Sequence, residues 1–122
     1  IDFQDMCIAP IGIDIAGILL DHYVSFDRLI IQKDLKYFLD HSDISLSEDD
    51  LFEFFRWSGI QRNMRILGTL ANLYCDEGRD FRLKDLPNIL SNLSCLIPDK
   101  NNSKSFFEDK VKNKLNERLE AL

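Results

Sequence analysis

The feature that most constrains this fold is one long apolar helix pattern over about residues 49–76. Apolar side chains recur there at spacings of three and four, which is the period of an α-helix. They fall into two adjacent strips, and a helix that is apolar over so much of its surface is central to a core. The first strip holds Trp57, Ile60, Met64, Leu67, Ala71 and Tyr74, and the second holds Phe52, Phe55, Ile66, Leu70 and Leu73. We therefore expect Trp57 and its strip to be buried by other helices.

Sequence signals mark both ends of this helix. Ser47 lies just before it and is followed three residues later by Asp50, an arrangement that resembles a capping box. Gly78 follows the last apolar turn, where a left-handed residue commonly ends a helix. The polar strip between these ends contains Gln61, Arg62 and Arg65.

Four further helices are expected around the long one. The first starts at Asp14, with Ile15, Ile18, Leu19 and Tyr23 as its apolar side, and the second is capped within residues 25–27. The next starts near residues 83–87 and ends before Pro98, and the last starts near Ser103. Residues 1–3 could end a strand, but no convincing strand pattern follows. The sequence thus predicts an all-α fold of about five helices.

Composition excludes several classes of function. The net charge of −6 argues against nucleic-acid binding, which needs a basic surface. The longest apolar run is too short and too interrupted to span a membrane. Three widely spaced cysteines, Cys7, Cys75 and Cys95, form no zinc-binding motif. We expect them to be buried free thiols, which suits a reducing cytoplasm.

Two stretches carry a resemblance to a known family. The first is IDFQD, followed by Pro10 and IDIAGILLD; the second is WSGIQRNMRILGTLANLYCDEGRDFRLKDLPNIL. Together they cover about residues 1–97 and resemble the aminoglycoside phosphotransferase and choline-kinase-like superfamily. Within it, the second stretch is most similar to the bacterial cell-wall amino-sugar kinases, which phosphorylate the anomeric hydroxyl of N-acetylmuramate and N-acetylglucosamine.

This resemblance implies that the chain is the C-terminal helical subdomain of a protein-kinase-like fold. Residues 1–12 would be the remnant of a metal-binding turn, and residues 13–122 a helical bundle. The intact enzyme would transfer phosphate from ATP, with Mg²⁺, to an amino sugar during cell-wall recycling in the cytoplasm. The N-terminal β-lobe and the His-Gly-Asp catalytic loop are expected to be missing. We therefore expect this chain alone to be inactive and to hold neither ATP nor Mg²⁺.

The resemblance also assigns roles to individual residues. Asp2 matches the Asp that binds the magnesium bridging the nucleotide phosphates. Asp5 would support that site without touching the metal, and Asp14 would hold the backbone of the catalytic loop. No catalytic residue is assigned within the chain.

Gln61, Arg62 and Trp57 are candidates for contact with the sugar. The alternative for Gln61 and Arg62 is a contact between helices or a surface charge, and the alternative for Trp57 is the core. Two other functions stay open for the whole chain. One is a kinase of an aminoglycoside or a choline-like alcohol, and the other is a stand-alone helical interaction module.

Overall fold

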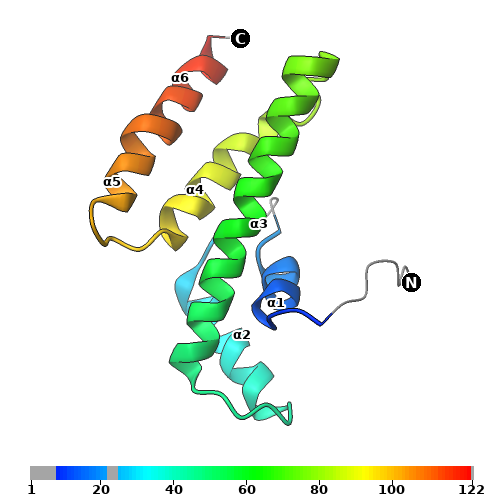
Figure 1. The fold of residues 1–122 in the computed structure, drawn as a ribbon, viewed down its shortest axis with the longest axis vertical. Coiled ribbons are helices and arrows are strands. Elements are labelled where there is room, and N and C mark those ends of the chain that lie inside the picture. The colour runs from blue at the N-terminus through cyan, green and yellow to red at the C-terminus, as the bar shows by residue number, and fades with distance from the viewer. Residues whose placement is uncertain (1–7, 22–24, 122) are drawn as a thin grey trace.

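The computed structural model describes residues 8–21 and 25–121, and within these ranges it contains helices and no strand. The elements are α1 (Gly12–Leu19), α2 (Arg28–Asp40), α3 (Glu48–Glu77), the 3-10 turn η1 (Leu83–Asp85), α4 (Leu86–Leu96), α5 (Ser103–Phe107), the π-helical turn η2 (Glu108–Lys112) and α6 (Asn113–Glu120). Because α5, η2 and α6 follow one another without a break, they form one continuous helical arm (Figure 1). The prediction of an all-α fold with about five helices is confirmed, while the strand expected at residues 1–3 lies outside the described residues.

The long helix α3 organises the molecule. α1 and α2 pack against its N-terminal half, α4 packs against its C-terminal half, and the arm joins the molecule through α4 (Figure 1). Ser47 caps α3 as expected, because its Oγ accepts a hydrogen bond from the backbone N–H of Asp50 at 3.1 Å. Gly78 ends the helix with a φ of 65°, which confirms the predicted left-handed residue.

The core has two parts that meet at Ile60. One lies between α1, α2 and the first half of α3, and the other lies between α4, the second half of α3 and the arm. The buried members of the first part are Ile15, Ala16, Leu20, Ile31, Leu35, Leu51, Phe55 and Leu96, and those of the second are Leu70, Leu86, Ile89, Leu90, Leu93 and Phe107. Phe55 and Leu70 of the second strip of α3 are thus buried in the core together with Leu51, and Ile60 and Leu67 of the first strip pack against it partly buried.

The first strip of α3 is not buried as expected. Trp57 is 54% exposed and Met64 is 47% exposed, whereas Phe55 of the second strip is fully buried. The reason is that Trp57 and Met64 face a hollow beside the arm, whereas Ile60 and Leu67 of the same strip are partly buried against the core. The prediction that Trp57 belongs to the core is wrong.

α1 begins at Gly12 and carries Asp14 in its first turn, which agrees with the prediction that Asp14 lies at the N-terminal end of a helix. Two smaller predictions need correction. Ile18, expected on the apolar side of α1, is 77% exposed. Cys75 and Cys95 are exposed, because each lies on the surface side of its helix, and Cys7 is outside the described residues. No described helix combines the length and the hydropathy that a membrane crossing requires.

The segment that enters α2 is tied to α4 by two asparagine side chains. The backbone N–H of Phe26 donates to Oδ1 of the buried Asn92 at 2.9 Å, and Ser25 Oγ donates to Oδ1 of Asn88 at 3.3 Å. Asp27 then caps α2 by accepting from the backbone N–H groups of Leu29 and Ile30. These bonds join the two halves of the fold.

Candidate functional site

The resemblance assigns roles to three aspartates, and the structure describes one of them, Asp14. Asp2 and Asp5 lie outside the described residues. Its side chain is exposed on the first turn of α1, and it lines a hollow of about 310 Å³ between α1 and α2. Asp34 and Phe38 line the same hollow from α2. An exposed carboxylate in this place can accept hydrogen bonds from a group outside the described residues.

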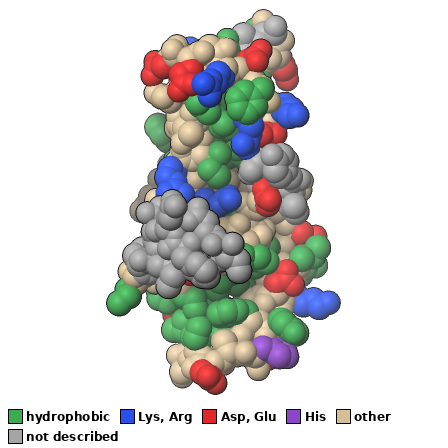
Figure 2. All heavy atoms as spheres, turned by 90° about the vertical axis from the view of Figure 1, so that its right-hand side faces the viewer, with side chains coloured by type: hydrophobic (Ala, Val, Ile, Leu, Met, Phe, Trp, Pro, Cys, Tyr) green, Lys and Arg blue, Asp and Glu red, His purple; other side chains and the backbone are tan. Residues whose placement is uncertain are grey.

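Large apolar side chains are exposed on α1 and α2. Ile13 and Ile18 of α1 are 46% and 77% exposed, and Leu29 of α2 is 78% exposed. Figure 2 views the molecule from the side of α1. Hydrophobic side chains gather over the lower half of the molecule in this view. Large apolar side chains exposed on these helices are available for contact with another molecule or another part of a protein.

The position of α1 is fixed by one strip of α3. A Cβ atom added to Gly12 would lie 2.3 Å from the backbone carbonyl oxygen of Phe54 and 2.7 Å from Oγ of Ser58. Only glycine permits this approach of the two backbones, since real Cβ atoms do not come so close. At the other end of α1, Arg62 Nη1 donates a 2.8 Å hydrogen bond to the carbonyl oxygen of Leu20. Residues 54, 58 and 62 are four apart, so they lie on one face of α3.

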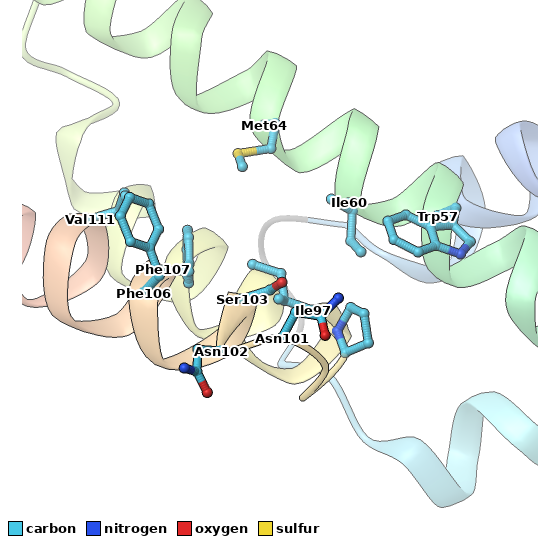
Figure 3. Close-up of a pocket in the computed structure, with 11 residues that line it drawn as sticks. Trp57, Ile60, Met64, Ile97, Asn101, Asn102, Ser103, Phe106, Phe107 and Val111 are labelled. Carbon is cyan, nitrogen blue, oxygen red and sulfur yellow. The ribbon is translucent and has the colours of Figure 1, made fainter.

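Trp57 belongs to a different face of α3. With Ile60 and Met64 it lines a hollow of about 630 Å³ between α3 and the arm (Figure 3). Phe106, Phe107 and Val111 form the opposite wall of the hollow, and Ile97, Pro98, Asn101, Asn102 and Ser103 close one end. The guanidinium carbon of Arg56 lies 5.6 Å from the centre of the Trp57 ring, which is within the range of a cation–π contact.

The three residues proposed to touch a sugar therefore do not form one cluster. Arg62 points to α1, Trp57 lines the hollow beside the arm, and Gln61 is exposed on the surface between these two faces. The contact of Arg62 runs between helices, as the alternative interpretation expected, but its partner is a backbone carbonyl rather than a carboxylate. Substrate contact by Gln61 and Trp57 stays a prediction.

The described residues do not form a metal centre by themselves. Across residues 8–21 and 25–121, no group of three or more His, Cys, Asp or Glu side chains is placed to hold an ion. One or two carboxylates without bound phosphates make a poor Mg²⁺ site.

Sequence reasoning missed two features of the fold that shape these sites. The first is the contact of Asn88 and Asn92 with the segment before α2, and the second is the hollow bounded by Phe106. A signal for the first was present, because two asparagines four residues apart interrupt the apolar face of α4. A polar residue on a buried face needs a hydrogen-bond partner.

Comparison with known proteins shows that the chain is similar in sequence to a kinase. The chain is 26% identical over 98 residues to the N-acetylmuramate/N-acetylglucosamine kinase of Neisseria meningitidis serogroup B (strain ATCC BAA-335 / MC58). The matched region is 76% of this chain and spans only 29% of that kinase. No family model and no solved structure matches the chain. The chain is thus distantly related to a kinase.

Proposed function

We propose that this chain forms the helical part of an ATP-dependent phosphotransferase that phosphorylates an amino sugar in cell-wall recycling. The observation that carries the proposal is the 26% identity over 98 residues to a kinase of N-acetylmuramate and N-acetylglucosamine. The all-α architecture and the small share of that kinase covered, 29%, support a helical portion of a larger enzyme. The alternatives of an aminoglycoside kinase or a choline kinase share the IDFQD stretch but not the specific relative.

In this proposal Asp2 would hold Mg²⁺, because a hard cation prefers carboxylate oxygen. The ion would neutralise charge on the transferred phosphoryl group. Asp14 would accept hydrogen bonds from the backbone of a catalytic loop, which its exposure on the first turn of α1 permits. Asp5 would support the metal-binding turn without contacting the ion.

Arg62 takes a positioning role in this proposal rather than a substrate role. Its bond to the Leu20 carbonyl fixes the end of α1, and α1 carries Asp14. Gln61 lies beside the α1 face and could reach a sugar hydroxyl. Trp57 is on the other face, so we do not assign Gln61 and Trp57 to the same sugar ring.

The chain alone is proposed to be inactive. Its sequence contains no His-Gly-Asp segment, so the residue that orients the acceptor hydroxyl in such kinases is not among its 122 residues. Phosphoryl transfer depends mainly on positioned groups, and without them little rate enhancement remains. We place the complete enzyme in the cytoplasm, where ATP is available.

A helical interaction module remains the second candidate function. The exposed Ile18 of α1 and Leu29 of α2 favour it, because a module needs apolar contact surface. The same side chains would be covered in a larger enzyme, so exposure alone does not separate the two functions.

The discriminating experiment is a substrate panel on the complete product of the gene that encodes this sequence. ATP and Mg²⁺ are supplied with N-acetylmuramate, N-acetylglucosamine, an aminoglycoside or choline, and phosphorylated product is measured by mass spectrometry. We expect transfer to the two amino sugars. Transfer only to choline or the aminoglycoside would replace the substrate, and no transfer to any of them would favour the interaction module.

A further inference from the structure

The hollow beside Trp57 is separate from the site proposed for phosphoryl transfer, because it opens on the α3 face that does not carry α1. Its volume of about 630 Å³ lies within the range of small-molecule sites. Three large apolar side chains stand exposed at its edge, namely Trp57 (54%), Met64 (47%) and Phe106 (64%). The close-up shows side chains of α3 and of the arm facing each other across it (Figure 3).

The arm that forms the second wall is held by specific contacts. Phe107 is buried at 3% exposure in the core with α4, and Ser94 Oγ donates a hydrogen bond to the carboxylate of Glu108. Asn101 and Asn102 have φ values of 53° and 59°, so the turn before the arm is left-handed at two successive residues. Strained backbone and π-helical turns such as η2 cluster at functional sites.

A basic rim adjoins the apolar hollow. Lys110, Lys114 and Arg118 line a second hollow of about 230 Å³, and Val111 lines both hollows. None of these three cations forms an ion pair with another described residue. Among the described residues, no acidic side chain lines either hollow.

The combination points to one ligand chemistry. An apolar surface with aromatic walls favours an alkyl chain, since burial of apolar area is the main driving force for such binding. The adjacent unpaired cations favour a negative charge at one end of that chain. The arm, which starts at Ser103 and supplies the second wall and the cations, lies beyond the stretch of about residues 1–97 that resembles kinases, whereas Trp57, Ile60 and Met64 lie within that stretch.

We propose that the hollow between α3 and the arm binds a single-chain anionic amphiphile of the long-chain carboxylate class. The alkyl chain lies along Trp57, Met64 and Phe106, and the carboxylate is held by Lys110, Lys114 and Arg118. This proposal goes beyond the phosphotransferase function and does not depend on it.

The test uses the fluorescence of Trp57, which is the only tryptophan of the chain. Dodecanoate is titrated into the full 122-residue chain below the concentration at which it forms micelles. We expect a saturable blue shift, because the alkyl chain displaces water from the indole. Dodecyltrimethylammonium, which has the same alkyl chain and a positive head, is expected to bind about tenfold more weakly.

Two sets of variants separate the apolar and the charged parts of the site. The Lys110→Gln, Lys114→Gln, Arg118→Gln triple variant is expected to weaken dodecanoate binding about tenfold. Its control is the Lys33→Gln, Lys36→Gln, Lys84→Gln variant, which changes net charge equally at exposed positions away from the hollow. Met64→Asp places a charge against the alkyl chain and should abolish the blue shift. Circular dichroism of each variant checks that the helices remain.

Any of four results with the amphiphiles or the variants would overturn the proposal. They are the absence of a saturable shift in the wild-type chain, equal affinity for the cationic amphiphile, equal loss in the control triple variant, or full binding by a folded Met64→Asp variant. A shift produced only by vesicles of anionic phospholipid, and not by dodecanoate, would assign the surface to a membrane and would also overturn it. A shift produced only by an acidic helical peptide would do the same in favour of a protein partner.

Discussion

Arg62 of α3 donates a 2.8 Å hydrogen bond from Nη1 to the backbone carbonyl oxygen of Leu20, the residue that follows α1. The carbonyl groups at the end of a helix have no partner within the helix, so they require one from outside. The guanidinium group supplies that partner and places a positive charge at the negative end of the α1 dipole. A residue that sequence reasoning grouped with substrate contacts thus holds α1 in place.

Replacement of Arg62 should therefore lower the stability of the fold. We expect Arg62→Gln to reduce the free energy of unfolding by about 2 kcal/mol, because a hydrogen bond to a charged group is lost in a partly buried place. Urea denaturation followed by circular dichroism measures this change. The matched control is Arg65→Gln, one turn along on the exposed surface, for which we expect less than about 0.5 kcal/mol. Equal effects of the two variants would contradict the positioning role.

A methyl group on Gly12 should force α1 away from α3. The added Cβ would meet the carbonyl oxygen of Phe54 at 2.3 Å, and a backbone atom in a helix cannot move aside easily. We expect Gly12→Ala to lower the unfolding free energy by about 2 kcal/mol, as measured by thermal denaturation.

Gly17 provides the internal control on the same helix. A Cβ there meets nothing within 4 Å, so the better helix propensity of alanine should raise the stability by about 0.5 kcal/mol. If both alanine variants shift the melting temperature in the same direction, the close contact of α1 and α3 is not as described.

The elements that sequence could predict are those with strong local signals. The length and both caps of α3 follow from its apolar period, Ser47 and Gly78, and the structure agrees with the prediction. Which apolar residues of α3 are buried could not be predicted, because both strips are apolar and the burial of each residue depends on the helices that pack around it. Trp57 is exposed for that reason.

The same limit applies to the candidate site. Gln61 and Arg62 are adjacent in sequence, but helix geometry separates them by about 100° around the axis, so only one of them can face α1. The sequence identified Asp14 near the start of α1 through a resemblance, while its environment depends on Asp34 and Phe38 of the next helix, α2. A local sequence pattern predicts a helix but not the contacts between two helices.

The link between α4 and the segment before α2 provides a third prediction. Asn92→Leu has nearly the same size but leaves the backbone N–H of Phe26 without its acceptor in a partly buried place. We expect a loss of about 2 kcal/mol in the free energy of unfolding. Asn72→Leu, on the exposed surface of α3, should change it by less than about 0.5 kcal/mol in the same urea titration. A neutral result for Asn92→Leu would mean that this hydrogen bond does not join the two halves.

The exposure of Cys75 and Cys95 can be tested with a thiol reagent. In a Cys7→Ser variant, a thiol reagent such as dithiobisnitrobenzoate should modify both Cys75 and Cys95 without denaturant, because both are exposed. The absorbance of the released chromophore counts the reacted thiols. Reaction only after unfolding would restore the original expectation that these cysteines are buried.

The proposed function depends most directly on Asp14. In the complete gene product, kcat for phosphate transfer from ATP to N-acetylmuramate is measured for the wild-type protein, Asp14→Asn and the control Asp40→Asn, an exposed carboxylate at the end of α2. We predict a fall of about a hundredfold for Asp14→Asn with an unchanged melting temperature, because misplacement of a catalytic loop costs this much. The control should keep the wild-type rate. No transfer by the wild-type protein, or full activity of Asp14→Asn, would contradict the account.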